Sequence, residues 1–206
     1  MTNAASFWDR HAAGYAKRPV ADQASYEIKL DATRRYLTTS SKVLELGCGT
    51  GSTAIAHAPY AGNIVATDIS DGMLDIARQK ASDAGVENVE FRQARVDEIR
   101  ETGYDMVMAH SLLHLLEDRD IAIRQILTML KPGGVFVSST MCLGDAYRWV
   151  GWIKAPARAL GLFPLLRVFT ADQLRDSIRK AGFDIEYDWQ PSPKKGLFLV
   201  ARKPAD

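Results

Sequence analysis

The chain has 206 residues, a length that suits one domain with a substantial hydrophobic core. Its hydrophobic fraction of 47% is typical of a globular protein, and its net charge of +1 lacks the basic excess of proteins that neutralise nucleic-acid phosphates. Cys48 and Cys142 are too few for a secreted disulfide framework. The amino terminus has no basic region followed by an apolar run, and no apolar stretch is long enough to span a membrane. We therefore expect a cytoplasmic protein that has no nucleic-acid partner.

Short apolar runs alternate with helical patterns from residue 42 onward. The predicted strands cover residues 43–46, 63–68, 88–93, 105–110 and 135–140. The predicted helices between them cover residues 53–60, 71–84 and 119–130, and the Lys-Pro-Gly-Gly sequence of residues 131–134 ends the last one. Such alternation predicts a parallel sheet with helices on both faces and right-handed crossovers.

The last third of the chain follows a different pattern. An amphipathic helix is predicted at residues 171–181, and strands at 183–189 and 196–202 then follow one another without a helix between them. Two strands joined in this way must be antiparallel neighbours or nearly so. With a helical cap over residues 1–40, we expect a single domain over residues 1–206.

A glycine-rich segment, Glu45-Leu46-Gly47-Cys48-Gly49-Thr50-Gly51, lies where the first strand ends and the first helix begins. Glycines suit this turn because they adopt positive φ and let the backbone approach a ligand closely. The backbone amides and the helix amino terminus favour a negative group. Asp68 ends the second strand, where a carboxylate can accept hydrogen bonds from the two hydroxyls of a ribose.

Two alternatives to a nucleoside-type cofactor loop are a nicotinamide-binding loop and a glycine-rich turn without any ligand. A nicotinamide loop reads Gly-x-Gly-x-x-Gly, whereas this one reads Gly-x-Gly-x-Gly with Glu45 two places before the first glycine. A carboxylate there would repel a pyrophosphate, but it suits a ligand that carries an amino group and a sulfonium. Asp68 and the strand order argue against the ligand-free turn.

The segments at 43–51, 65–74, 104–114 and 130–134 resemble the motifs of class I S-adenosylmethionine-dependent methyltransferases, especially the ubiquinone/menaquinone-biosynthesis-like branch (methyltransferase domain 11/25 type). The resemblance covers nearly the whole chain. It implies a Rossmann-like three-layer α/β sandwich whose seven-stranded, mostly parallel sheet has the order 3-2-1-4-5-7-6 with strand 7 antiparallel. It also implies S-adenosylmethionine as cofactor and S-adenosylhomocysteine as product.

By this resemblance the three glycines line the methionine part of the cofactor, Asp68 holds the ribose, and Ile69 and Met73 pack on the adenine. The cofactor-binding residues expected are Tyr15, Arg18, Glu45, Gly47, Cys48, Gly49, Gly51, Asp68, Ile69, Met73, Ala94, Arg95, Val96 and His110. One position departs from the family pattern, because Arg95 stands where relatives often carry an acid. Adenine recognition then rests either on the backbone of residues 94–96 or on Asp97, which lies two places further on.

Methyl transfer from a sulfonium is an in-line displacement, for which the protein mainly aligns the reactants and excludes water. The candidate catalytic residues are His110, at a strand end beside the switch point of the sheet, and Tyr15, whose ring could face a cation. Each has a plain alternative, since His110 could merely end its strand and Tyr15 could be an ordinary core residue. His110 and His114 are four residues apart, but no third ligand is evident, so we expect no metal.

Residues 144–170 are expected to form a substrate lid, because this family commonly inserts a substrate cover after the fifth strand. Residues 146–169 combine aromatic and basic side chains with no acid, a composition suited to covering an apolar acceptor or to peripheral membrane contact; alternatively, these side chains close the core. Pro156 and Pro164 would break a long helix, which favours the lid. We therefore expect a methyltransferase acting on a small apolar or lipid- or quinone-like acceptor. A non-catalytic S-adenosylmethionine-binding regulator or partner activator and a nicotinamide oxidoreductase are the alternatives.

Overall fold

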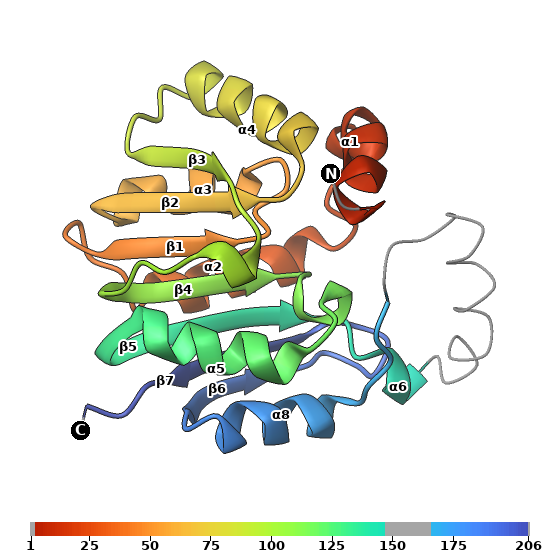
Figure 1. Ribbon diagram of the computed structural model, residues 1–206, viewed down its shortest axis with the longest axis vertical. Helices are drawn as coiled ribbons and strands as arrows, with labels where there is room; N and C mark the ends of the chain where they lie inside the picture. Colours follow the sequence, from red (N-terminus) through yellow and green to blue (C-terminus); the bar gives the residue numbers. More distant parts are fainter. Residues whose placement is uncertain (1–2, 147–165, 206) are drawn as a thin grey trace.

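A seven-stranded sheet with the order β3-β2-β1-β4-β5-β7-β6 forms the centre of the protein (Figure 1). The computed structural model describes residues 3–146 and 166–205. The strands are β1 Lys42–Leu46, β2 Asn63–Asp68, β3 Val89–Gln93, β4 Tyr104–His110, β5 Leu130–Thr140, β6 Asp184–Trp189 and β7 Leu197–Arg202. Strand β7 runs antiparallel to both β5 and β6, whereas the other neighbours are parallel. The predicted fold class and strand order are confirmed.

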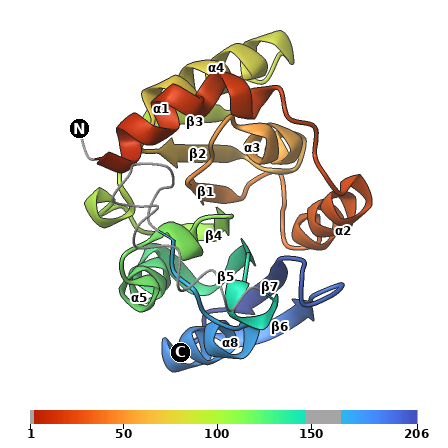
Figure 2. The same ribbon diagram turned by 90° about the vertical axis from the view of Figure 1, so that its right-hand side faces the viewer.

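Helices cover both faces of this sheet. They are α1 Asn3–Ala16, α2 Gln23–Arg34, α3 Ser52–His57, α4 Asp71–Asp83, α5 Arg119–Met129, α6 Leu143–Ala146 and α8 Ala171–Lys180, with short 3-10 helices η1 Ala58–Tyr60, η2 Val96–Glu98 and η3 Leu113–Leu115. None of the helices in the described ranges is long and apolar enough to cross a membrane. Figure 2 faces the carboxyl ends of the parallel strands, with α2 on one flank of the sheet and α5 on the other.

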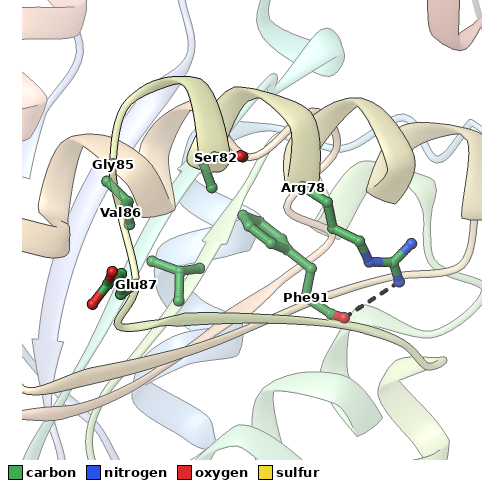
Figure 3. Close-up of a pocket in the computed structure, with 8 residues that line it drawn as sticks. Arg78, Ser82, Gly85, Val86, Glu87 and Phe91 are labelled. Atoms are coloured by element: carbon green, nitrogen blue, oxygen red, sulfur yellow. Dashed lines mark hydrogen bonds between the residues drawn. The ribbon is translucent and has the colours of Figure 1, made fainter.

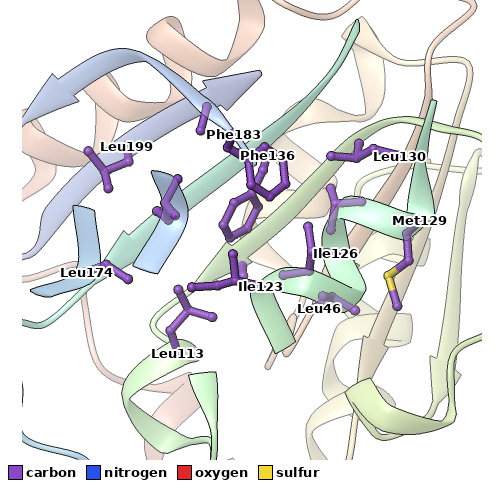
Figure 4. Close-up of a cluster of buried hydrophobic side chains, with 14 of the residues drawn as sticks. Leu46, Leu113, Ile123, Ile126, Met129, Leu130, Phe136, Leu174, Phe183 and Leu199 are labelled. Atoms are coloured by element: carbon purple, nitrogen blue, oxygen red, sulfur yellow. The ribbon is translucent and has the colours of Figure 1, made fainter. Parts of the chain in front are cut away.

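Alternation along the strands divides the hydrophobic core into two clusters. Leu44 of β1 belongs to the cluster on the face covered by α5 and α8. Phe136 of β5, Ile126 and Leu174 lie in the same cluster (Figure 4). Val43, one residue before Leu44, points to the opposite face, in the cluster that includes residues of α2, α3 and α4. This period of two is what β-geometry requires of strands that are buried on both faces. Packing on both faces therefore fixes the positions of the residues at the carboxyl ends of the strands.

Side-chain caps fix where several helices begin. Ser70 accepts a hydrogen bond from the Met73 N–H at the start of α4, and Asp118 accepts two from the first turn of α5. Thr170 and Gln173 form a capping box at the start of α8. Each cap satisfies backbone donors that the helix itself leaves without partners and contributes about 1 kcal/mol.

Some boundaries differ from those predicted. The helix expected at 53–60 ends at His57 and continues as η1, because Pro59 has no backbone N–H to donate. Strand β5 begins at Leu130, which pairs with Tyr104, and the ladder resumes only at Val135 opposite Met106. The predicted turn at residues 131–134 is therefore an irregularity within a strand rather than a linker before it.

Candidate functional site

The glycine loop follows β1 and leads into α3. Gly47, Gly49 and Gly51 have φ values of +66°, +53° and +74°, which other residues adopt only at a cost. A Cβ on Gly47 would lie 2.9 Å from Leu112 Cδ1, and one on Gly51 would lie 2.8 Å from Ala77 Cβ. A Cβ on Gly49, by contrast, would have no atom within 4 Å. The loop is thus packed at both ends and open at its middle glycine.

Asp68, at the end of β2, holds this loop in place. Its Oδ2 accepts a hydrogen bond from Gly49 N–H at 2.9 Å, and its Oδ1 accepts one from Ser70 N–H at 2.9 Å. Burial raises the pKa of Asp68, and the backbone donors partly offset that rise. Each carboxylate oxygen can accept more than one hydrogen bond, so capacity remains for a ligand hydroxyl.

Glu45 of β1 is a buried acid with a free acceptor. Glu45 is only 2% exposed, and its Oε2 has no hydrogen-bond partner among the described residues. Burial raises the pKa of Glu45 to about 8, the backbone N–H of Ala54 lowers it in part, and the nearby Asp68 raises it further. An unpaired buried acceptor is costly. A cationic ligand group beside Glu45 would remove that cost, so this residue fits the amino group or sulfonium of the expected cofactor.

Asp9 of α1 attaches the amino-terminal helix to this loop region, and the sequence analysis did not identify it. Asp9 Oδ1 accepts hydrogen bonds from Ser70 Oγ at 2.6 Å and from Gly72 N–H at 3.2 Å, next to Asp68. A Cβ on Gly72 would lie 3.5 Å from Ala12 Cβ, so the two helices pack closely. Helix α1 therefore lies against the start of α4. The sequence around Asp9 gives no sign of this role, because its hydrogen-bond partners lie more than sixty residues away.

Tyr15 and Arg18 follow on the same amino-terminal segment and are exposed. The Tyr15 ring meets Trp8 edge-on with 6.2 Å between centroids, and Arg18 N–H donates to the Tyr15 carbonyl. In the described part of the chain, no hydrogen bond or ring contact joins Tyr15 to the glycine loop. The cofactor and catalytic roles expected of these two residues thus remain predictions.

Residues 94–97, for which two modes of adenine recognition are open, contain an ion pair at the surface. The Arg95 guanidinium pairs with both oxygens of Asp97, at 2.8 and 3.0 Å, so a swing of Asp97 toward a ligand would break a bidentate ion pair. Ala94 N–H donates to the Asp68 carbonyl, which places this segment beside the ribose-side carboxylate. Ile69 is half-buried and Met73 is buried. Recognition through the backbone of residues 94–96 is the arrangement that leaves this ion pair intact.

His110 is the last residue of β4 and lies in a polar cluster with Lys29, His57 and Ser139 beneath α2 and α3. Lys29 Nζ donates to Ser139 Oγ at 2.9 Å, and His110 pairs with Ser139 across the β4–β5 ladder. Both ring nitrogens of His57 and Nε2 of His110 are buried without partners among the described residues. Burial, with the other cationic groups nearby, lowers the pKa of His57 to about 4 and that of His110 to about 3. Only His110 had been singled out from the sequence.

Uncharged side chains lie at the carboxyl edge beside this cluster. Leu113 and Cys142 are buried there, and burial lowers the pKa of His114 to about 4, so that its ring is uncharged at neutral pH. Within the residues the structure describes, no group of three histidine, cysteine or acidic side chains is arranged to hold a metal ion.

A separate hollow of about 470 Å³ lies between the end of α4 and β3 (Figure 3). Its lining residues are Arg78, Ala81, Ser82, Gly85, Val86, Glu87, Val89 and Phe91. None of the glycine-loop residues lines it, although a Cβ on Gly51 would lie 2.9 Å from the Phe91 ring. This hollow therefore lies behind the loop, toward the amino end of β3, and is distinct from the candidate cofactor site.

Most of the segment expected to form a lid, including Trp149, Trp152 and Phe163, lies outside the described residues. Its two described ends meet, because Gly144 N–H donates to the Phe169 carbonyl at 2.9 Å. Phe169 is buried in the core with the Arg119 guanidinium 4.2 Å from its ring centroid. Phe169, one of the aromatic residues of the 146–169 segment, therefore packs in the core, as the alternative to a lid expects of these side chains.

The sequence profile of the family described as "Methyltransferase domain" matches residues 37–181, more than half of the chain. The chain belongs to this family. The matched range contains the glycine loop, Glu45, Asp68 and His110, the residues that the fold brings to the carboxyl edge of the sheet.

Individual methyltransferases resemble the chain more distantly. "Uncharacterized methyltransferase YcgJ" of Bacillus subtilis (strain 168) is 27% identical over 158 residues, covering 71% of this chain and 62% of the relative. "Ubiquinone biosynthesis O-methyltransferase" of Acinetobacter baumannii (strain ACICU) is 28% identical over 141 residues, covering 67% of this chain and 58% of the relative. The chain thus spans about 60% of the length of these relatives. A solved structure described as a DhpI-SAH complex has the same fold, with a TM-score of 0.76, 20% identity and coverage of 99% of this chain and 97% of that one.

Proposed function

We propose that the protein binds S-adenosylmethionine at the 47–51 loop and transfers its methyl group to a small apolar or quinone-like acceptor. The observation that carries this proposal is the buried, unpartnered Oε2 of Glu45, four positions before Gly49, where a Cβ would meet no atom. When bound, S-adenosylmethionine supplies a methyl group already activated on a sulfonium. The protein has to bind, align and exclude water rather than generate a reactive species.

The residues of the loop region divide this task among them. Glu45 would neutralise the cationic end of the ligand, Gly49 would leave room for it, and Asp68 would accept hydrogen bonds from the ribose hydroxyls while also holding the loop. The backbone of residues 94–96 would meet the adenine. The positions of these groups along the carboxyl ends of β1, β2 and β3 support these roles.

The acceptor would lie at the carboxyl ends of β4 and β5. The uncharged His114 and the apolar Leu113 and Cys142 suit a small apolar molecule better than a cation. The printed name of the Acinetobacter relative, a ubiquinone biosynthesis O-methyltransferase, points to the same class of acceptor. In this proposal residues 1–206 form one domain, with residues 1–40 as its cap and residues 144–170 as its lid. Cys48 and Cys142, buried free thiols, suit the cytoplasm.

The experiment that tests this proposal is a screen for transfer of a labelled methyl group to quinone precursors, lipids and small amines. We expect label in a quinone precursor or another small ring compound. Label only in amines would contradict the acceptor class. Tight binding of S-adenosylhomocysteine with no transfer to any acceptor would contradict the enzymatic role and favour the non-catalytic alternative.

A further inference from the structure

Lys29 reaches from α2 to the carboxyl edge of the sheet. Helix α2 flanks that edge on the side opposite α5 (Figure 2). The hydrogen bond from Lys29 Nζ to Ser139 Oγ joins residues 110 positions apart in sequence. Ser139 is the penultimate residue of β5, and its ladder partner His110 ends β4. The ammonium group therefore lies at the ends of β4 and β5, where the acceptor is proposed to bind.

No carboxylate of the described residues forms an ion pair with this ammonium. Among the described residues, no carboxylate oxygen lies within 4.0 Å of Lys29 Nζ, the distance limit for an ion pair. Asp22, the acid at the start of the same helix, is already bonded to Ser25 N–H at 3.1 Å, to Ser25 Oγ at 2.7 Å and to Lys195 Nζ at 2.9 Å. The sequence of residues 147–165, which lie between the two described ranges, contains no acidic residue.

The neighbouring groups do not compensate the charge either. His57 and His110 are close enough for their charged forms to repel one another or Lys29, and burial keeps both rings neutral. Burial also lowers the pKa of Lys29, with Asp22 opposing the shift and Lys195 adding to it. A half-buried ammonium whose partner is one hydroxyl is costly unless an anion joins it. An anion from outside the described chain would supply a second partner for this ammonium.

We infer that Lys29, fixed on Ser139, binds an ionised oxygen of the methyl acceptor, as in a phenolate, an enolate or a carboxylate. This inference rests on the proposed function and specifies its acceptor. Charge-assisted hydrogen bonds from an ammonium to such an oxygen are about twice as strong as neutral ones, so the site discriminates against uncharged analogues.

The carboxylate of the cofactor is a second anion to which the Lys29 ammonium could donate hydrogen bonds. The position of Lys29 favours the acceptor. The glycine loop extends β1, whereas Ser139 lies on β5, with β4 between them. Neighbouring strands are about 4.8 Å apart, so the Ser139 strand is roughly 10 Å from the loop strand. Ser139, the hydrogen-bond partner of the ammonium, is thus separated from the loop strand by the strand that His110 ends.

Lys29 also explains how an acceptor hydroxyl can react without a strong base. The hydroxyl loses its proton to solvent, and the ammonium stabilises the oxyanion that remains. An oxygen lone pair then forms the bond to the methyl carbon, while the electron pair of the carbon–sulfur bond returns to sulfur. His110, with its pKa lowered to about 3, is too weak a base to hold that proton.

The test compares two ring compounds of similar shape on protein saturated with S-adenosylhomocysteine. The ring hydroxyls of 4-nitrocatechol can ionise, whereas its dimethyl ether 4-nitroveratrole cannot. Calorimetry at neutral pH measures both dissociation constants in the wild type, Lys29→Met, Lys29→Arg and the control Lys180→Met, which alters an exposed lysine of α8. Thermal melts confirm that each variant is folded. Binding of S-adenosylhomocysteine and of 5′-methylthioadenosine, which lacks the amino-acid end, is measured in parallel.

We expect the wild type and Lys180→Met to prefer 4-nitrocatechol by about tenfold or more, Lys29→Met to lose that preference, and Lys29→Arg to keep most of it. Equal affinity for the two probes in the wild type overturns the inference and leaves the proposed function standing. Rejection of both probes contradicts the proposed ring acceptor itself. If Lys29→Met weakens S-adenosylhomocysteine but not 5′-methylthioadenosine, Lys29 binds the cofactor carboxylate and the inference is wrong.

Discussion

The Asp68 carboxylate accepts a hydrogen bond from the Gly49 backbone N–H at 2.9 Å, so the residue expected to hold the ribose also holds the loop that faces it. Replacing Asp68 therefore has two consequences that must be separated. Loss of the loop bond lowers the stability of the ligand-free protein, whereas loss of the ribose bonds lowers only the affinity for ligand.

Asp68→Ala should weaken binding of S-adenosylhomocysteine by at least tenfold, because each charge-assisted hydrogen bond contributes about 1.5–3 kcal/mol. The 2′,3′-dideoxy analogue provides the matched comparison. In the wild type the analogue should bind more weakly than S-adenosylhomocysteine, and in Asp68→Ala the two should bind alike. A variant that still distinguishes the two ligands by the wild-type factor would show that Asp68 does not contact the ribose.

Gly49 provides a test of the space in the loop. Gly49→Ala places a methyl group where no atom lies within 4 Å, so it should cost only the strain of its φ of +53°, about 1–2 kcal/mol, yet block the ligand. Gly85→Ala is the matched control, with a φ of +64° and equally open surroundings after α4. Thermal melts should shift alike in the two variants, and calorimetry should show binding lost only in Gly49→Ala. Wild-type affinity in a folded Gly49→Ala variant would rule out a ligand at this position.

Ligand binding beside Glu45 should be coupled to the release of a proton. With its pKa raised to about 8 by burial, the free carboxyl is mostly protonated at pH 7. A cationic ligand favours the ionised form, so binding lowers that pKa and releases up to one proton. Affinity for S-adenosylhomocysteine should rise with pH up to about 8 and then level off. Calorimetry in buffers of different ionisation enthalpy measures the release directly.

The same pKa shift has a consequence for stability. A carboxyl whose pKa is higher in the folded than in the unfolded protein contributes stability below its unfolded value of 4.5, and this is lost as the pH rises through about 8. Glu45→Gln, which is never ionised, should therefore abolish the proton release and stabilise the ligand-free protein above pH 8. Unchanged proton release in Glu45→Gln would assign the effect to another group.

The positions of the strands and the glycine loop could be predicted because they are encoded locally, whereas the strand order came from the resemblance to the methyltransferase family. Alternating apolar runs identify buried strands, the absence of a helix between residues 189 and 197 requires the antiparallel pair β6–β7, and positive φ at Gly47, Gly49 and Gly51 follows from their residue type.

The polar contacts of the site could not be predicted in this way. The bond between Lys29 and Ser139 depends on how α2 lies over the finished sheet. His57 looks like an ordinary polar residue of a short helix, yet the fold buries it completely. The ion pair between Arg95 and Asp97 is local, but the sequence analysis did not identify it and left open whether adenine recognition rests on the backbone of residues 94–96 or on Asp97. If residues 144–170 form a lid, Trp149→Ala and Trp152→Ala should impair methyl transfer much more than cofactor binding. Both tryptophans lie outside the described ranges, so this remains a prediction.

The most direct test of the central claim is calorimetric titration of the wild-type protein with S-adenosylhomocysteine and, separately, with NAD. The Glu45 carboxylate and the Gly-x-Gly-x-Gly spacing suit a cationic amino-acid end and disfavour a pyrophosphate, so the account predicts saturable one-site binding of S-adenosylhomocysteine and no measurable binding of NAD. Failure to bind S-adenosylhomocysteine, or tighter binding of NAD, would contradict it.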